Sequence, residues 1–333
     1  MLRARPRLLA ALLLLLLRTA APYCQVASLA GSLAGSPGAT DAVGTAATFK
    51  APSGVALAAG ATPALYVADT GNHMIRSIAL PSAAVTRVAG SPSAASGFLD
   101  GPGTAALLFS PTALVLNGSL LYIADRNNFR LRSWSAASGA LATVAGGAAA
   151  GGADGACLAG AAFVGPLALA WDGARALYVA DVSPSNTAGA VIRQVTAGPG
   201  ACAVRTLAGA AGTAPANGIG TAATFSRSVA LVFMGSGVLW VGDSGNNLLR
   251  AIDTASGAVS TLAGSGSRAD VDGVALGAGS TAWTACGATA RGGRWWRRSM
   301  LACCAACRQR WQWRGWPLRA PAGRAMARAP APR

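Results

Sequence analysis

The sequence predicts an all-β fold built from four copies of one four-stranded unit, because three markers recur in constant order along its 333 residues. A Tyr-Val-Ala-Asp-like tetrad ends at Asp69, Asp125, Asp181 and Asp243. A Leu/Val-Ala-Gly triplet ends at Gly35, Gly90, Gly146, Gly209 and Gly264. The third marker is Asp or Asn followed eight or nine residues later by Phe, as in Asp41 to Phe49, Asp100 to Phe109, Asp154 to Phe163 and Asn217 to Phe225. Self-similarity at a nearly fixed period is the signature of a repeat architecture.

Within the first copy, four short runs of aliphatic and β-branched residues are each bounded by Gly, Pro, Asn or Asp. They are residues 54–58, 65–68, 74–78 and 84–89. This pattern is typical of strands joined by tight turns. The sequence therefore predicts a four-stranded sheet in each copy, and four-stranded sheets repeated about an axis are the blades of a β-propeller.

Two kinds of turn support the strand assignment. In the second copy Asn117-Gly118 separates residues 113–116 from 119–124, and we expect a two-residue hairpin with both turn positions at positive φ. At the next corner, Asp69-Thr70-Gly71-Asn72 and Asp243-Ser244-Gly245-Asn246 repeat one chemistry. There we expect the Asp side chain to accept backbone N–H groups and Gly or Asn to take the left-handed position. The polar turn residues that recur along the chain are Asp69, Asn72, Asp125, Asn128, Asp181, Asp243 and Asn246.

Residues 66–76, Tyr-Val-Ala-Asp-Thr-Gly-Asn-His-Met-Ile-Arg, followed by Thr-Arg-Val-Ala-Gly at 86–90, closely resemble the NHL repeat. Residues 122–132 and 240–250 match the same motif, and residues 178–193 match it with a five-residue insertion. The resemblance implies a propeller related to the six-bladed TolB-like and SMP-30-like proteins. Its members bind proteins, RNA or small ligands, or catalyse reactions, so the resemblance predicts fold rather than function.

The number of copies is smaller than in that family. We expect a propeller over residues 25–282, with complete units at 36–90, 91–146, 147–209 and 210–264 and a partial fifth at 265–282. Val26–Gly31 resembles the outermost strand that completes the last blade of a propeller. Its partner blade is missing from the pattern, so the sequence leaves ring closure open and predicts a truncated propeller. An unclosed sheet edge favours pairing with another chain.

The N-terminus has the three parts of a secretory signal peptide: Arg3, Arg5 and Arg7, the apolar run Leu8–Leu17, and small residues up to Ala21. We expect cleavage near Ala21, signal peptide 1–21, and a secreted or cell-surface protein. The apolar run has ten residues, whereas a spanning helix needs about 20. We therefore expect no transmembrane span after cleavage.

The net charge of +16 is concentrated at the two ends of the chain. Residues 26–290 hold 12 basic residues and all 11 acidic ones, so the body is nearly neutral and nucleic acid is not an expected partner of the propeller. Residues 283–333 hold six of the nine tryptophans, four of the seven cysteines and eleven arginines. Three interpretations stay open: an out-of-frame or truncated artefact, a disordered basic tail, or a binding module. As a zinc motif this segment is weak, because its cysteines lack a second Cys-x-x-Cys half and any histidine; they are Cys286, Cys303, Cys304 and Cys307.

Residues that recur in every unit are best explained by structure. We therefore interpret the four tetrad aspartates as turn residues, and Arg76, Arg132, Arg193 and Arg250 as solvated or blade-pairing residues. His73, the only histidine, lies in a turn and reads as a surface residue. The sequence predicts no catalytic residue, no metal site and no cofactor.

Two enzyme classes have related propellers. Calcium-dependent lactonases of the gluconolactonase and paraoxonase kind depend on an axial Glu, and this chain has no Glu. Amidating lyases hold zinc with several histidines, which one histidine cannot supply. These features favour a binding protein over an enzyme. Two alternatives stay open. One is a calcium-dependent hydrolase of the lactonase kind, which bound metal would distinguish from a binding protein. The other is a nonfunctional fragment of a longer propeller protein.

With enzymes disfavoured, recognition of a ligand at the protein surface is the remaining class of function. Four features of the sequence are relevant to it. Ser183, Pro184, Ser185, Asn186 and Thr187 form a candidate ligand loop within the inserted segment of unit three, since loops that depart from their repeat commonly carry binding. Arg126, Arg130 and Arg132 surround Phe129 as a small basic cluster. Asn117 begins a glycosylation sequon. Cys157 and Cys202 are a candidate disulfide. The predicted function is a secreted or cell-surface, non-enzymatic scaffold that binds a protein or glycan through blade loops.

Overall fold

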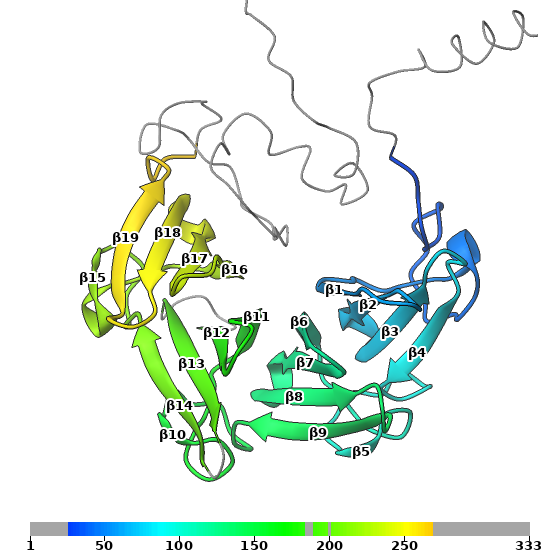
Figure 1. Cartoon of the computed structure of the whole chain (residues 1–333). Helices are drawn as coiled ribbons and strands as arrows, with labels where there is room; N and C mark the ends of the chain where they lie inside the picture. Colours follow the sequence, from blue (N-terminus) through cyan, green and yellow to red (C-terminus); the bar gives the residue numbers. More distant parts are fainter. Residues whose placement is uncertain (1–25, 184–188, 199–200, 269–333) are drawn as a thin grey trace, which may run out of the picture. The chain divides into compact units, whose positions relative to one another are not determined.

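Aliphatic runs form the strands of this protein, and Gly, Asn, Asp and Pro end them, as the sequence predicts. The computed structural model describes residues 26–183, 189–198 and 201–268, which all belong to one unit spanning residues 25–292. Four antiparallel sheets follow one another along the chain (Figure 1). This confirms the predicted all-β class and its four repeated sheets, each of the kind that forms a propeller blade.

Each sheet is an up-and-down meander. The first contains β1 (Val55–Ala58), β2 (Ala64–Asp69), β3 (Met74–Ala79) and β4 (Val85–Ala89). The second contains β5 (Gly101–Pro102), β6 (Pro111–Asn117), β7 (Leu120–Asp125), β8 (Arg130–Ser135) and β9 (Ala140–Ala145). The third contains β10 (Gly155–Ala156), β11 (Pro166–Trp171), β12 (Ala176–Val182), β13 (Ala190–Gly198) and β14 (Ala201–Ala208). The fourth contains β15 (Gly218–Ile219), β16 (Ser228–Phe233), β17 (Val238–Asp243), β18 (Leu248–Asp253) and β19 (Ala258–Ala263).

Short 3-10 turns complete the units. They are η1 (Gly44–Ala46), η2 (Thr70–Asn72), η3 (Arg126–Asn128), η4 (Gly220–Ala222) and η5 (Ser244–Asn246). In the last three sheets a two-residue strand from the start of the unit pairs with the final long strand, giving the order β5-β9-β8-β7-β6 in the second sheet. In the first sheet this outer strand is reduced to a single bridge between Val43 and Ala84.

Neighbouring sheets pack through their first strands and through aromatic pairs. β1 contacts β6, β6 contacts β11, and β11 contacts β16 (Figure 1). The tyrosine of each of the first three Tyr-Val-Ala-Asp-like tetrads packs on an aromatic ring of the next sheet. The ring centroids are 5.5 Å apart for Tyr66 and Trp134, 5.7 Å for Tyr122 and Trp171, and 5.8 Å for Tyr178 and Phe233. Each unit therefore buries part of its apolar surface against the following unit, as repeat proteins do.

The expected outermost strand at Val26–Gly31 is wrong. These residues form no strand. Instead Gly31 donates its backbone N–H to the carbonyl of Gly44 at 3.2 Å, and Ala30 packs beside Phe49 against the first sheet's buried residues. The segment folds onto its own unit because apolar surface is available there. Residues 264–268 also contain no strand, and the rest of the expected fifth unit lies outside the described residues. No strand pair joins the first and fourth sheets in the described part of the chain.

The hairpin of the second sheet is shifted by one residue from its expected position. Asn117 pairs with Leu120, so the two-residue loop is Gly118-Ser119 rather than Asn117-Gly118. Only Gly118 has a positive φ, of 58°. Glycine at the first central position suits a type II′ turn, which joins twisted strands as well as the expected type I′ turn does.

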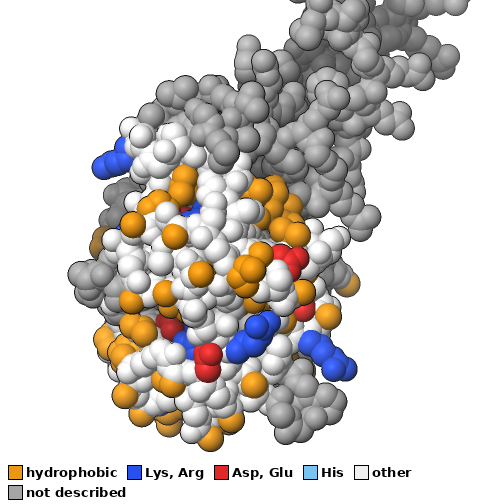
Figure 2. Space-filling model, turned by 90° about the vertical axis from the view of Figure 1, so that its left-hand side faces the viewer, with side chains coloured by type: hydrophobic (Ala, Val, Ile, Leu, Met, Phe, Trp, Pro, Cys, Tyr) orange, Lys and Arg blue, Asp and Glu red, His pale blue; other side chains and the backbone are white. Residues whose placement is uncertain are grey.

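Charged side chains are sparse on the face of the described residues that Figure 2 shows. One face shows scattered Lys, Arg and Asp groups of both signs among uncharged atoms (Figure 2). A search of the described residues finds no helix with the length and apolarity needed to cross a bilayer.

Candidate functional site

Each sheet is built around a buried ion pair between its tetrad aspartate and an arginine on the following strand. The guanidinium Nη1 lies 3.0 Å from the carboxylate in Arg76–Asp69 and 2.9 Å in Arg132–Asp125. It lies 3.3 Å away in Arg193–Asp181 and 3.2 Å in Arg250–Asp243. All four arginines are at most 1% exposed. The expectation that they are solvated is therefore wrong.

The other end of each guanidinium binds the start of its own unit. Nη2 pairs with Asp41 at 2.6 Å in the first unit, with Asp100 in the second and with Asp154 at 2.8 Å in the third. In the fourth it donates to the side-chain oxygen of Asn217 at 2.7 Å. These acceptors are the Asp or Asn of the third sequence marker. A phenylalanine ring also lies near each guanidinium, and in units one, three and four it is the marker's Phe49, Phe163 and Phe225, at 4.9, 5.5 and 5.2 Å. In unit two the ring is Phe98, at 4.9 Å, and not the marker's Phe109. The repeated markers thus converge on one ionic centre per sheet.

An asparagine completes the centre in three units. Asn72 Nδ2 donates to Asp69 Oδ2 at 2.8 Å and to the carbonyl of Gly38 at 2.7 Å. Asn128 makes the same pair of bonds to Asp125 and Gly97, at 2.8 and 2.7 Å. Asn246 donates to Asp243 at 2.9 Å. In the first two units the amide therefore links the end of the second strand to the loop that opens the unit.

The other carboxylate oxygen accepts a backbone N–H from that same opening part of the unit. Lys50 N donates to Asp69 at 2.7 Å, Phe109 N to Asp125 at 2.8 Å, and Ser226 N to Asp243 at 3.0 Å. Burial raises the pKa of the Asp125 and Asp243 carboxyls, and hydrogen bonds from these donors oppose that rise. These hydrogen bonds and ion pairs of the turn aspartates therefore stabilise their own units.

The left-handed position of the turn differs from the sequence expectation. It is occupied by the residue after the asparagine: His73 at φ 56°, Phe129 at φ 57° and Asn247 at φ 54°. Gly71 is needed for a different reason, since a Cβ there would lie 2.8 Å from the Lys50 carbonyl oxygen. Close approach of two backbones, rather than positive φ, explains this glycine.

Unit three departs from this arrangement. Asp181 pairs in register with Val191, as Asp69 pairs with Met74, but here the pairing continues to Val182 and Ala190, so a longer connection stands where unit one has its tight turn. A Cβ on Gly189 would lie 2.2 Å from the Gly212 carbonyl oxygen and 2.9 Å from that of Phe225, so this glycine is needed for close approach to the fourth unit. Among the described residues, the Asp181 carboxylate accepts from Arg193, from Val164 N at 2.9 Å and from Gly165 N at 2.7 Å.

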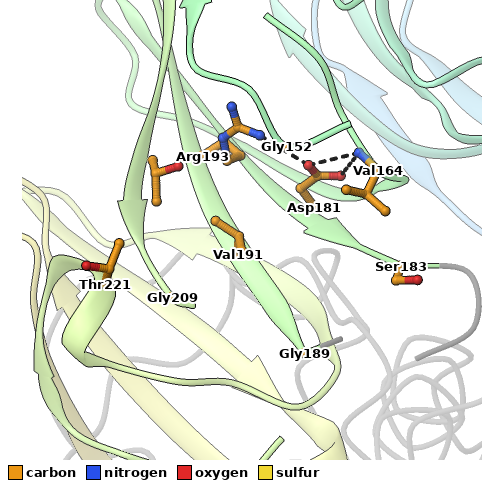
Figure 3. Close-up of a pocket in the computed structure, with 10 residues that line it drawn as sticks. Gly152, Val164, Asp181, Ser183, Gly189, Val191, Arg193, Gly209 and Thr221 are labelled. Atoms are coloured by element: carbon orange, nitrogen blue, oxygen red, sulfur yellow. Dashed lines mark hydrogen bonds and ion pairs between the residues drawn. The ribbon is translucent and has the colours of Figure 1, made fainter. Parts of the chain in front are cut away.

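A cavity of about 190 Å³ lies at this departure (Figure 3). Its lining residues come from the third unit and the start of the fourth: Gly152, Val164, Asp181, Ser183, Gly189, Val191, Arg193, Thr206, Gly209 and Thr221. Val191, which lines this cavity, stands in register where the other units have the longer Met74, Arg130 and Leu248. We define these residues as the third-blade cavity.

The candidate ligand loop borders this cavity in part. Ser183 lines it, whereas Pro184, Ser185, Asn186 and Thr187 lie outside the described residues. The sequence singled out the insertion, but not the cavity, because the lining residues, from Gly152 to Thr221, are brought together only by the fold. Across the described residues, no group of three or more His, Cys, Asp or Glu side chains gathers in a metal-binding arrangement.

The basic cluster of unit two is divided by the fold. Arg132 is buried in its ion pair, and Arg130 lies 3.8 Å from the centroid of the Phe98 ring. Arg126 lies in η3. Burial lowers its pKa, and the positive charge of Arg227 lowers it further. The three side chains therefore do not form one patch.

His73 joins the first sheet to the second and is not merely a surface residue. Its Nδ1 accepts the backbone N–H of Ser110 at 3.1 Å, and its ring meets Phe109 edge-on at 5.3 Å. Burial, followed by the nearby charge of Lys50, lowers its pKa below 6.5. Only the neutral ring with a free Nδ1 lone pair can accept this hydrogen bond.

We expect stability to depend on pH through His73. Because the folded pKa is below the unfolded value of 6.5, the unfolded chain binds more protons between the two values. The contribution of the neutral His73 ring to the free energy of unfolding is complete above pH 6.5 and decreases as pH falls toward the folded pKa. Urea unfolding between pH 5 and 8 should show this slope in wild type and a reduced slope in His73→Asn, which keeps the residue type found at Asn247. Equal slopes would contradict the assignment.

Cys157 and Cys202 form a disulfide, with their Cα atoms 5.3 Å apart. They lie beside the pairing of β10 with β14, where Cys157 N also donates to the Cys202 carbonyl at 3.0 Å. Asn117, the expected glycosylation site, is half-buried at the end of β6 beside the exposed Gly118-Ser119 turn. Its occupancy stays a prediction.

No protein-family model and no curated protein matches this chain. Among solved structures, it is similar to a structural genomics protein of unknown function from Bacteroides thetaiotaomicron VPI-5482. The two are 20% identical over 77% of this chain and 68% of that one, with a TM-score of 0.43. A calcium-binding protein, regucalcin from Agrobacterium tumefaciens str. C58, is 16% identical over 65% of this chain and 60% of that one, with a TM-score of 0.42. Streptogramin B lyase is 11% identical over 64% and 55%, with a TM-score of 0.40. The chain thus spans less than two thirds of the latter two proteins.

Proposed function

We propose that this protein is a recognition scaffold of NHL repeats that binds a protein or glycan ligand at the third-blade cavity. One observation carries the proposal: unit three keeps the aspartate and arginine of the repeat, and the third-blade cavity opens beside them. Val191, which lines the cavity, stands in register where the other units have the longer Met74, Arg130 and Leu248. A departure from the repeat that opens a mainly apolar cavity beside a buried ion pair is where binding is expected to be added.

The chemistry of the repeat favours binding over catalysis. The tetrad aspartates accept hydrogen bonds from arginines and backbone N–H groups inside their sheets. The single histidine uses Nδ1 to accept from Ser110. Groups that serve as acids, bases or metal ligands in enzymes are here engaged in holding the fold.

A secreted or cell-surface location forms part of the proposal. The disulfide between Cys157 and Cys202 supports it, because disulfides persist mainly in oxidising compartments. The charged and apolar parts of residues 1–21 and the Asn117 sequon support it as well. A tagged full-length chain should be recovered from the culture medium or cell surface, with an N-terminus near residue 22.

Binding at the cavity is tested by blocking it. Gly152 lines the cavity, is exposed, and has open space around the position of a Cβ. Gly152→Leu should therefore add a bulky group at the edge of the cavity, where it obstructs a ligand, without disturbing the backbone. Gly60→Leu is the matched control, since Gly60 is an exposed glycine in the β1–β2 turn with equally open surroundings.

The full-length secreted chain is used to select binders from a phage-displayed peptide library and is applied to a glycan array. We expect ligands that bind wild type and Gly60→Leu but lose at least tenfold in affinity for Gly152→Leu. Ligands bound equally by all three proteins would contradict the proposed site. A complete absence of binders from both collections would contradict recognition of a peptide or glycan.

A further inference from the structure

Neighbouring sheets of this protein contact each other three times through the same two faces. We call the face that meets the preceding sheet the leading face, and the face that meets the following sheet the trailing face. In the first such contact, Tyr66 and Ile75 on the trailing face of the first sheet pack with Leu114, Leu121 and Ile123 on the leading face of the second. The same arrangement recurs between the second and third sheets and between the third and fourth. The first and fourth sheets are the two ends of this series (Figure 1).

The leading face of the first sheet is exposed at β1, where its counterparts are buried. In strand register Val55 corresponds to Leu114, Leu169 and Leu231. Val55 is 60% exposed, whereas each of the three leucines is 8% exposed and lies in a cluster with the preceding sheet. The outer part of the same face is covered by residues 30–49 of its own unit. The exposed apolar surface therefore centres on β1.

Leu57 shows the same difference two residues further along β1. In register it corresponds to Trp171 and Phe233. Those rings stack with Tyr122 and Tyr178 of the preceding sheets, with centroids 5.7 and 5.8 Å apart. Leu57 is 53% exposed. A repeat that ends a series of repeats normally has a polar outer face, so an apolar end face indicates a partner.

The fourth sheet presents the complementary trailing face. Trp240 has the place of the tetrad tyrosine, and no aromatic ring packs on it in the part of the chain that the structure describes. Leu249, on the same face, is partly buried, whereas its counterparts Ile75, Leu131 and Ile192 are 0% exposed. The fourth sheet thus carries the aromatic and aliphatic side chains that a leading face receives elsewhere in the chain.

We propose that the leading face of the first sheet binds the trailing face of the fourth sheet of a second copy of this chain. The Trp240 ring of one copy packs on Leu57 of the other, as Tyr178 packs on Phe233 within the chain. The occupant is a second copy because the chain carries both halves of an interface that it already forms three times. The inference goes beyond the proposed function, since neither Leu57 nor Trp240 lines the third-blade cavity.

The contact is heterologous, because the two faces differ and each copy has one of each. Heterologous contacts give a closed ring or an open series of copies. Two copies that make the contact in both directions join two sets of four sheets, eight in all. Closed propellers typically have about four to eight blades, so a ring of this size is within the range of the fold. We therefore expect a dimer.

Sedimentation velocity of the full-length secreted chain, at increasing micromolar concentrations, measures the association. Wild type should be a dimer. Leu57→Asp places a charge on the leading face, and Trp240→Arg places one on the trailing face, so each variant alone should associate at least tenfold more weakly. Leu158→Asp is the matched control and should remain a dimer, since Leu158 is a 68% exposed leucine of the third unit, away from both end faces.

Mixing the two variants separates a lost contact from a lost fold. The Leu57→Asp copy keeps its trailing face and the Trp240→Arg copy keeps its leading face, so the mixture should form a dimer through one intact contact. The two introduced charges are opposite in sign and face each other at the second contact. Leu249→Arg replaces Trp240→Arg in a second mixture, which does not depend on folding of the tryptophan variant. Mixtures that stay monomeric with both trailing-face variants would overturn the heterologous contact.

The remaining outcomes also decide the inference. Species larger than a dimer that Leu57→Asp abolishes support the same contact in an open series. Dimers of both single variants would show that copies associate through another surface, which overturns it. Monomeric wild type at every concentration overturns it as well, and the occupant of the leading face would then be another part of the same chain, such as residues 269–333, or a different protein.

Discussion

Replacing Arg132 by alanine lowers the free energy of unfolding by about 3–5 kcal/mol, the largest effect expected of a single substitution in this protein. Arg132 is fully buried, its Nη1 lies 2.9 Å from the equally buried Asp125, and its Nη2 donates to the Leu99 carbonyl at 3.0 Å and to Asp100. Removing the guanidinium leaves the Asp125 carboxylate buried without its cation. Urea denaturation followed by circular dichroism measures the loss.

The neighbouring Arg130→Ala is the matched control. Arg130 packs over Phe98 and donates to the Asn128 carbonyl, but its side chain is half-buried and it has no buried carboxylate partner. We expect it to cost about 1 kcal/mol or less. In a double variant, Asp125→Asn should recover part of the Arg132→Ala loss by removing the unpaired charge. A loss below about 1 kcal/mol for Arg132→Ala would show that the ion pair does not hold the sheet.

Removing the disulfide has the second-largest expected effect. Cys157 and Cys202 are separated by 45 residues, and closing a loop of that length stabilises a folded chain by about 4 kcal/mol in the chain-entropy description. The double variant Cys157→Ala, Cys202→Ala should lose about 2–4 kcal/mol. Alanine is preferred to serine, because Cys157 is 2% exposed and serine would bury a hydroxyl.

Chemical reduction provides the control for the alanine variants. Wild type unfolded in excess dithiothreitol should approach the stability of the double variant, whereas the double variant should not respond to the reductant. If oxidised wild type and the double variant unfold at the same urea concentration, the bridge does not form in the protein as secreted.

Strand positions were predictable because they depend on local chemistry. The Asn, Asp and Gly positions that end β2 and β7, and the aliphatic runs between them, are readable within a few residues. The repeat supplied the number of sheets, since each marker appears once in each of them. Turn details were less predictable: Gly71 was read as a source of positive φ, whereas the fold requires it for close approach to Lys50.

The buried arginines could not be recognised from local sequence. Arg76 follows Asp69 by seven residues, a spacing that also suits a solvated strand residue. Its second partner, Asp41, lies 35 residues earlier and comes within 2.6 Å only when the start of the unit folds across the sheet. His73 was misread for the same reason, because Ser110 and Phe109 belong to the next unit.

By itself, the amino-acid sequence determined an all-β chain of four repeated sheets, since strand periodicity and turn chemistry act over a few residues and recur. The tertiary structure alone decided what the repeated polar residues do, because desolvated charges need partners from distant segments. It also decided where the third-blade cavity lies. Its lining residues, from Gly152 to Thr221, are far apart in the chain, and only the folding of unit three against the start of unit four brings them together.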